Sequence, residues 1–178
     1  MDNIGTIVTI GIVILVVVTI IKTARIVPQK SAFIVERLGK YAKTLEAGFH
    51  ILFPFIERVA YKHSLKEVAV DVPSQSCITR DNIAVEVDGV LYLQVMDPMK
   101  ASYGIENFMF ASTQLAQTTM RSEIGKLELD RTFEERENIN GAIIEAVDKA
   151  SDPWGIKITR YEIKNIEPPN SVKDALEK

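Results

Sequence analysis

The residues that could carry chemistry are few, and their spacing fits no common catalytic or metal site. The two histidines, His50 and His63, lie thirteen residues apart, and the chain has a single cysteine, Cys77. A zinc site needs three or four ligands, usually in closely spaced pairs, so both histidines are interpreted as structural. Cys77 has no adjacent histidine or basic pair to activate its thiol, and it is interpreted as a small buried hydrophobe.

Familiar catalytic motifs are also missing from the sequence. It contains no phosphate-binding loop, glycine-rich dinucleotide motif, HExxH zinc motif, GxSxG nucleophile motif or CxxC pair. The acidic run of residues 134–137 fits the first turn of a helix, where negative charge suits the helix dipole. We therefore predict no catalytic residue, no cofactor, no metal site and no enzyme activity. A membrane-tethered hydrolase stays as an alternative, and it would need a cleft of convergent polar groups.

Charged residues are distributed unevenly along the 178-residue chain. Residues 1–21 contain one charged side chain, Asp2, so residues 22–178 hold all 21 Lys and Arg and 23 of the 24 Asp and Glu. The chain therefore combines an apolar N-terminal segment with an ordinary charged domain. A net charge of −3 without a long basic run argues against nucleic acid as the main partner.

The apolar segment, residues 4–21, has no charge, amide or proline, and thirteen of its eighteen residues are Ile, Val or Leu. In lipid only a helix satisfies every backbone group within one segment, and eighteen residues of helix cover about 27 Å. We predict a transmembrane helix rather than a cleaved signal peptide, which would need a basic n-region, or a re-entrant hairpin, which would need a mid-span kink. The expected membrane-spanning residues include Ile4, Ile10, Ile14, Val17 and Ile21.

Basic residues follow this segment, and none precedes it. The positive-inside rule then places the body in the cytoplasm and Met1 outside. For a bacterial protein this means the inner membrane, and the mitochondrial inner membrane is the alternative.

The body is expected to meet the membrane surface through two sets of side chains. Lys22, Arg25 and Lys30 would attract anionic lipid heads by about 1 kcal/mol each. The run of residues 49–56 has six strongly apolar side chains among eight. Two interpretations stay open: a buried strand with Pro54 at its end, or an aromatic loop that dips into the interface. In the second, the contacting residues are Phe49, Phe53, Pro54 and Phe55.

The body begins with short strands, predicted at residues 32–37, 41–45 and 65–72, the last closed by Pro73. A longer strand over residues 83–95 has apolar side chains at every second position and ends at Asp97-Pro98. A final strand covers residues 156–166. The alternation favours an antiparallel sheet.

Two helices are predicted between these last strands. The first begins after Asn107 and ends near Gly125, and the second begins at Thr132 with a Thr132/Glu135 capping box and ends at Ser151. A further helix from residue 172 stops at Lys178, which suggests that the natural chain continues. The expected buried stripes are Phe108, Ala111, Leu115, Thr118 and Ser122 in the first helix, and Phe133, Asn140, Ile143, Val147 and Ala150 in the second.

The predicted fold class is therefore α+β, with an N-terminal transmembrane helix followed by a mostly antiparallel sheet with packed helices. Its expected divisions are an anchor at residues 1–25, a domain at 26–168 and a truncated helix at 169–178.

Several longer segments carry a family resemblance, and together they cover about residues 26–170. The longest, residues 114–125, reads QLAQTTMRSEIG. The others are residues 26–29, 35–41, 47–50, 54–55, 88–92, 97–98, 100–104, 135–137, 140, 154–156 and 160–164. The chain resembles stomatin-type SPFH (band 7) proteins, and in particular the paraslipin branch of stomatin-like proteins from bacteria and mitochondria.

This resemblance implies an SPFH domain and a function in the membrane. Such proteins are non-enzymatic scaffolds that assemble into large homo-oligomeric rings or cages and organise lipid microdomains. They restrain or recruit membrane proteases and other membrane proteins, and bacterial members often have NfeD-type partners. A monomeric membrane-anchored adaptor that binds one partner is the alternative.

Overall fold

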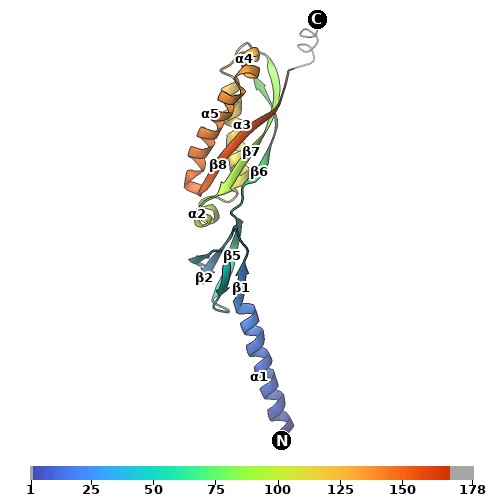
Figure 1. The fold of residues 1–178 in the computed structure, drawn as a ribbon, viewed down its shortest axis with the longest axis vertical. Helices are drawn as coiled ribbons and strands as arrows, with labels where there is room; N and C mark the ends of the chain where they lie inside the picture. Colours follow the sequence, from blue (N-terminus) through green and yellow to red (C-terminus); the bar gives the residue numbers. More distant parts are fainter. Residues whose placement is uncertain (1, 169–178) are drawn as a thin grey trace. The chain divides into compact units, whose positions relative to one another are not determined.

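The structure, a computed structural model, describes residues 2–168, without the side chains of residues 2–4, 6 and 22 (Figure 1). The predicted helix at residues 172–178 lies outside the described residues. The chain divides into two units, Met1–Leu65 and Lys66–Lys178, which are described separately.

Unit 1 consists of one helix and two small antiparallel sheets. The two-stranded sheet pairs β1 with β4, and the three-stranded sheet has the order β3-β2-β5. Val27, Val35, Leu45 and Leu52 form a small buried core that joins the two sheets. The elements are α1 (Asp2–Thr23), β1 (Ala24–Val27), β2 (Ser31–Arg37), β3 (Lys40–Leu45), β4 (Gly48–Ile51) and β5 (Glu57–Ser64).

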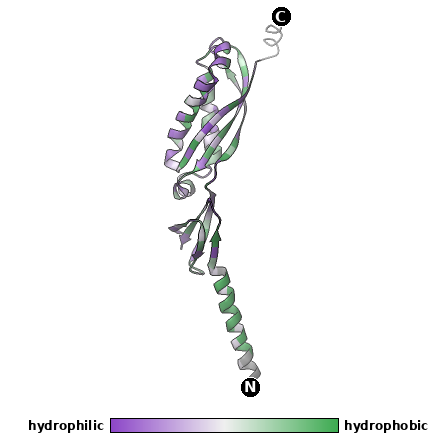
Figure 2. Cartoon of the chain, viewed as in Figure 1, coloured by the Kyte–Doolittle hydropathy of each residue, from purple (hydrophilic) through white to green (hydrophobic). Residues whose placement is uncertain are grey.

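Apart from glycine and threonine, the described side chains of α1 are apolar on every side of the helix (Figure 2). All twelve Ile, Val and Leu side chains from Ile7 to Ile21 are exposed, including the expected spanning residues Ile10, Ile14 and Val17. The hydroxyls of Thr9 and Thr19 donate to backbone carbonyls one turn earlier in the helix, those of Gly5 and Leu15. Among the described residues, no helix combines the length and the hydropathy needed to cross a membrane.

Unit 2 is a three-stranded antiparallel sheet, in the order β6-β7-β8, with helices packed on it. Helices α3 and α5 contact each other, while α3 also contacts β6 and α5 contacts β8 (Figure 1). The elements are β6 (Val68–Ile78), β7 (Ala84–Val95), α2 (Pro98–Tyr103), α3 (Phe108–Ile124), α4 (Leu129–Glu134), α5 (Arg136–Ser151), a 3-10 turn η1 (Asp152–Trp154) and β8 (Ile156–Glu167).

The predicted antiparallel sheet and its long alternating strand are confirmed. Along β7 the residues from Val85 to Val95 at every second position are buried. The strand prediction that ended at Pro73 is wrong, because β6 continues through it. A register shift between Val72 and Gln75 takes Pro73 out of the ladder, where its missing N–H does no harm. Gln117 in α3 donates to the Pro73 carbonyl (3.1 Å), so the bulge also ties the helix to the sheet.

Both predicted ends of the first helix are confirmed, but its buried face is not the expected one. The Asn107 side chain accepts from the Phe110 N–H (3.0 Å), and Gly125 ends the helix. Of the expected stripe, Thr118 and Ser122 are exposed, and Phe108, Ala111 and Leu115 are only partly buried. The buried residues are Ser112, Thr113, Ala116, Met120 and Ile124.

The predicted capping box at Thr132 is wrong. Thr132 lies inside α4, where its hydroxyl donates to the Glu128 carbonyl (2.9 Å). A separate helix, α5, begins at Arg136 and ends at Ser151 as expected. Its buried residues are Ile139, Ile143, Val147 and Ser151, so two of the five expected stripe residues are confirmed. The short helix α2 was not predicted, although Asp97-Pro98 is a typical start, with Asp97 accepting from Met99 and Lys100.

Gly89 in β7 is required by close packing. A Cβ there would lie 2.4 Å from the Tyr161 hydroxyl oxygen and 2.8 Å from the Glu162 carbonyl oxygen. We expect Gly89→Ala to lower the free energy of unfolding of unit 2 by about 1–3 kcal/mol through overpacking. Gly141→Ala is the matched control, since nothing lies within 4 Å of its Cβ position in α5. The control should raise stability by about 0.5–1 kcal/mol.

Urea unfolding followed by the fluorescence of the single tryptophan, Trp154 in unit 2, measures both changes. Equal effects of the two substitutions would contradict this account of Gly89.

Candidate functional site

The most unusual surface of unit 1 is the segment of residues 49–56. Phe49, Phe53 and Phe55 are 65%, 62% and 98% exposed, and Leu52 is the one buried side chain of the segment. The interpretation as a buried strand is therefore wrong: β4 ends at Ile51, and the remainder is an exposed turn. Large contiguous apolar surfaces of this kind mark contact with a membrane or another protein.

Glu57, which sequence reasoning missed, holds this turn in place. The Glu57 N–H donates to the Phe53 carbonyl (3.0 Å), and the Glu57 carboxylate accepts from the Phe53 N–H (3.1 Å). These two bonds close the turn and leave Phe55 at its tip with a positive φ of 68°. A bulky residue adopts that conformation only when its surroundings impose it.

The Glu57 carboxylate is fully buried and doubly paired. Arg37 Nη2 lies 2.6 Å from Oε1, and Lys43 Nζ lies 3.1 Å from Oε2. The Arg37 hydrogen bond is the main cause that lowers the pKa of Glu57 to about 2; the Phe53 N–H and Lys43 also lower it, and burial acts in the opposite direction. The carboxylate is therefore charged at neutral pH, and Arg37 also lies 5.8 Å above the Phe53 ring.

One further apolar residue that was not predicted extends the surface. Leu38, at the tip of the β2–β3 hairpin, is 81% exposed and has a φ of 50°. Its N–H donates to the Ile56 carbonyl (3.2 Å), so the hairpin tip contacts the exposed turn of residues 53–56, here named the aromatic turn. The only sequence signal for this was an apolar residue in the Arg37-Leu38-Gly39 turn, a position where polar residues are usual.

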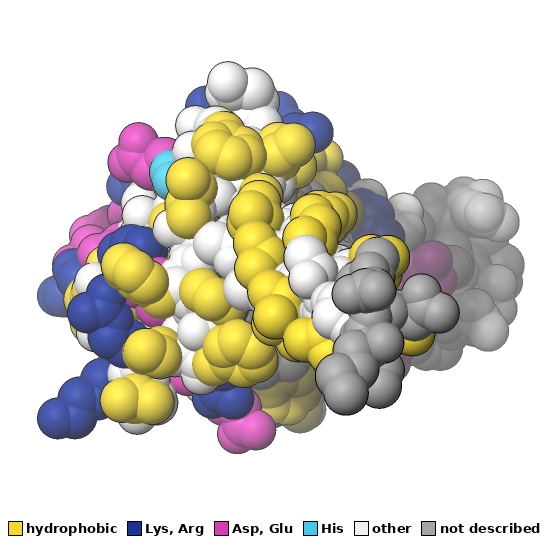
Figure 3. Space-filling model, turned by 90° about the horizontal axis from the view of Figure 1, so that it is seen from below, with side chains coloured by type: hydrophobic (Ala, Val, Ile, Leu, Met, Phe, Trp, Pro, Cys, Tyr) yellow, Lys and Arg dark blue, Asp and Glu magenta, His cyan; other side chains and the backbone are white. Residues whose placement is uncertain are grey.

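The predicted interface residues all belong to unit 1, and several lie together. A hollow of about 590 Å³, the loop hollow, is lined by Ile14 and Val18 of α1 and by Pro54 and Phe55 of the turn. In the view from below in Figure 3, apolar side chains, in yellow, gather in the middle, and both basic (blue) and acidic (magenta) side chains lie toward the edge of the view. Arg25 lies in β1, Lys30 in the turn before β2 and Phe49 in β4, whereas the side chain of Lys22 lies outside the described residues.

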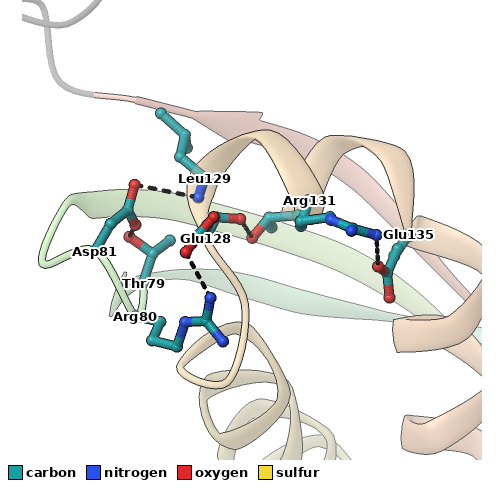
Figure 4. Close-up of polar contacts among 8 residues, drawn as sticks. Thr79, Arg80, Asp81, Glu128, Leu129, Arg131 and Glu135 are labelled. Atoms are coloured by element: carbon teal, nitrogen blue, oxygen red, sulfur yellow. Dashed lines mark hydrogen bonds and ion pairs between the residues drawn. The ribbon is translucent and has the colours of Figure 1, made fainter.

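A polar cluster in unit 2 is the other concentration of charged groups (Figure 4). The Asp81 carboxylate accepts from the Thr79 hydroxyl and from the Leu129 N–H (3.4 Å), while Arg80 pairs with Glu128. The Thr79 hydrogen bond lowers the pKa of Asp81, so this group is a poor proton donor. Since Glu128 makes no side-chain cap, Asp81 satisfies a free N–H of α4 from the β6–β7 turn. The cluster therefore joins two elements and does not resemble a catalytic centre.

The remaining side chains that could carry chemistry are either hydrogen-bonded or buried. Cys77 is buried, and burial raises the pKa of its thiol. The His50 ring nitrogen Nε2 lies 2.7 Å from the Glu46 carbonyl oxygen, and Tyr161 donates to the Met120 sulfur at 3.1 Å. Among the described residues, no three His, Cys, Asp or Glu side chains lie close enough to hold a metal ion.

Comparison with known proteins decides the family. Residues 25–178 match the SPFH domain / Band 7 family. The chain belongs to this family. Human mitochondrial stomatin-like protein 2 is 53% identical over 151 residues, which are 85% of this chain and 42% of the relative. The stomatin-like protein stl-1 of Caenorhabditis elegans is 50% identical over 151 residues, 85% of this chain and 47% of the relative.

The resemblance to the paraslipin branch is thus confirmed. An uncharacterized protein of Methanothermobacter thermautotrophicus is also similar, with 44% identity over 167 residues, 94% of this chain and 52% of that protein. The chain spans about half or less of the length of these relatives. SPFH and stomatin-like proteins are generally membrane-associated scaffolds and are generally non-enzymatic.

Glu57 should set both the stability and the acid sensitivity of unit 1 of this SPFH protein. Its pKa is near 2 when folded against an ordinary value of 4.5, so its contribution is full above about pH 4.5 and is lost as pH falls toward 2. We expect Glu57→Gln to cost about 1.5–3 kcal/mol at pH 7, because Arg37 and Lys43 lose their partner, and to remove that pH dependence. Amide hydrogen exchange of β2 and β5 measures the effect.

Glu46→Gln is the matched control, since this exposed carboxylate forms no ion pair with a described residue. The control should change stability by less than about 0.5 kcal/mol. An unchanged pH dependence in Glu57→Gln would refute the assignment.

Proposed function

We propose that this protein is a membrane-anchored scaffold subunit whose unit 1 sits in the membrane interface. The observation that carries the proposal is the exposed turn Phe53–Ile56, fixed by Glu57 beside the apolar helix α1. Twelve exposed aliphatic side chains on α1 and the almost fully exposed Phe55 are costly in water and favourable in lipid. Membrane association in the family supports the same conclusion.

In this arrangement α1 anchors the protein in the lipid, and the turn enters the leaflet next to it. Pro54 and Phe55 line the loop hollow together with Ile14, so lipid chains would fill a space bounded by helix and turn. The helix supplies most of the affinity, because its apolar area is much larger than that of one turn. The turn then fixes the depth and tilt of unit 1 through its aromatic rings.

The basic residues after α1 favour a bacterial inner membrane with the body on the cytoplasmic side. The mitochondrial inner membrane is the alternative, and the relatives named as mitochondrial support a membrane location of that kind. Arg25 and Lys30 are exposed near the start of the body, where anionic lipid heads would meet them.

Scaffolding would come from assembly of many such subunits into a ring or cage. A closed ring encloses a patch of bilayer and multiplies weak contacts by avidity, so it can organise a lipid microdomain. The same assembly would recruit or restrain membrane proteins such as proteases, or an NfeD-type partner.

Membrane contact of the turn is tested by its depth in the bilayer. We expect a tryptophan introduced by Phe55→Trp to be quenched by lipids brominated on their acyl chains, because the side chain lies at the turn tip. The wild-type protein, with Trp154 in unit 2 as its only tryptophan, provides the control and should be quenched little. Equal quenching in both proteins, or none at position 55, would disprove interfacial insertion.

Assembly is tested by particle mass in mild detergent. We expect the chain, extended with the corresponding C-terminal part of human stomatin-like protein 2, to form particles of many subunits, each heavier than the 19.9 kDa of the 178-residue chain, and to give ring images by electron microscopy. A monodisperse monomer would instead favour the adaptor function.

A further inference from the structure

The five sulfur-containing side chains of unit 2 divide into an exposed group and a buried group. Met96 is 64% exposed, and Met99 and Met109 are each 39% exposed. By contrast, Met120 and Cys77 are buried. Methionine usually fills gaps inside a core, so packing does not explain three exposed thioethers that lie close together in the sequence.

The backbone at the three exposed methionines is held by bonds that involve no sulfur atom. The Met96 N–H donates to the Gly155 carbonyl (2.9 Å), and the Met99 N–H donates to the carboxylate that caps α2 (3.0 Å). Met109 lies in the first turn of α3, which also has a side-chain cap. A chemical change at one of these sulfur atoms therefore leaves the local backbone bonds in place.

The side chains next to the exposed methionines in the sequence are also apolar and exposed. Tyr103 follows Met99 by four residues, on the same face of α2, and Phe110 follows Met109 directly. Oxidation of a thioether to a sulfoxide turns a flexible apolar side chain into a polar one. Sulfoxides at the three methionines would therefore make the surface of α2 and of the start of α3 polar.

The fold protects the two buried sulfur atoms from an oxidant in solution. The Met120 sulfur is enclosed and accepts the Tyr161 hydroxyl (3.1 Å). A thiol reacts as its thiolate, and burial raises the pKa of Cys77, so this thiol is protonated at neutral pH. A thioether has no proton to lose, and its oxidation depends mainly on access. We therefore expect the exposed methionines of this chain to be oxidised before its cysteine.

We propose that Met96, Met99 and Met109 form a reversible oxidation site for peroxides, which makes an apolar surface of unit 2 polar while the buried sulfur atoms stay reduced. In the forward step a sulfur lone pair attacks one oxygen of hydrogen peroxide, and the O–O bond breaks. That oxygen stays on the sulfur as the sulfoxide, and the other leaves as water with both hydrogens. In the return step a dithiol supplies two electrons and two protons, becomes a disulfide, and the sulfoxide oxygen leaves as water.

The test is peptide mapping by mass spectrometry of the full chain in mild detergent, after a timed exposure to hydrogen peroxide. We expect Met96, Met99 and Met109 each to gain oxygen at least about tenfold faster than Met120, while Cys77 stays reduced. These rates should not change between about pH 6 and pH 8, whereas a thiolate reaction would rise by about tenfold per pH unit. In urea the rates of the four methionines should become equal, because the unfolded chain gives the oxidant equal access.

Reversal and substitution separate this site from general oxidative damage. Methionine sulfoxide reductases A and B, one for each sulfoxide epimer, should remove the added oxygens when dithiothreitol is present. The triple variant Met96→Leu/Met99→Leu/Met109→Leu keeps apolar side chains of similar size and should gain no oxygen in unit 2. Cys77→Ala is the matched control, and it should leave the oxidation of the three methionines unchanged.

The oxidised protein should keep its fold, because the backbone bonds at the three methionines do not involve sulfur. Its urea midpoint, followed by the fluorescence of Trp154, should equal that of the reduced protein.

Four outcomes would overturn the inference. They are oxidation of Met120 as fast as the exposed methionines, oxidation of Cys77 before them, a lowered urea midpoint after oxidation, and sulfoxides that the reductases leave in place. All four are read from unit 2 and do not depend on membrane contact or assembly. The oxidation site can therefore fail while the scaffold function stands, and the reverse.

Discussion

The presentation of the aromatic turn depends on one buried carboxylate. A turn that exposes Phe53 and Phe55 gains nothing from burial, and its backbone does not pair with a neighbouring strand. Glu57 supplies what the turn lacks, because its N–H and its carboxylate both bond the backbone of Phe53. The carboxylate can stay charged and buried only because Arg37 and Lys43 pair with it. Removing Arg37 or Lys43 takes away one of the two partners of this buried charge, and removing Glu57 leaves the turn unsupported.

Unit 2 is stabilised in a different way. Its helices and strands form backbone hydrogen bonds within regular secondary structure, and side chains bond the backbone where these elements meet. The alternation of β7 buries one face of this central strand, and α3 and α5 pack on its neighbours β6 and β8. At the junctions, the Gln117 side-chain amide donates to the Pro73 carbonyl in the bulge of β6. The Asp81 carboxylate accepts from the Leu129 N–H at the start of α4. These contacts span more than forty residues of sequence, so the helices and the sheet edge are mutually dependent.

The features that depend on residues close together in the sequence were predicted correctly. The β7 alternation, the Asn107 cap and the helix end at Ser151 each depend on residues a few positions apart, and each is confirmed. The Thr132 capping box failed because the first N–H of α4 is bonded by Asp81, a distant residue that no short motif reveals. The 49–56 run stayed ambiguous for the same reason: exposure of its rings is decided by the partners of Glu57. The missed α3 face includes two hydroxyl residues that an apolar pattern does not mark. The Thr113 hydroxyl donates to the Met109 carbonyl, whereas the buried Ser112 hydroxyl has no hydrogen-bond partner among the described residues.

Apolar and charged groups occupy different parts of unit 1, and they differ in their response to salt. The apolar area of α1 and the turn tip is little affected by salt. Arg25 and Lys30, in contrast, are exposed, and exposed charges interact weakly beyond a Debye length of about 8 Å at physiological salt. Affinity for the membrane would therefore come mainly from the helix and the turn, while the basic residues add a smaller, salt-dependent attraction to anionic lipid heads.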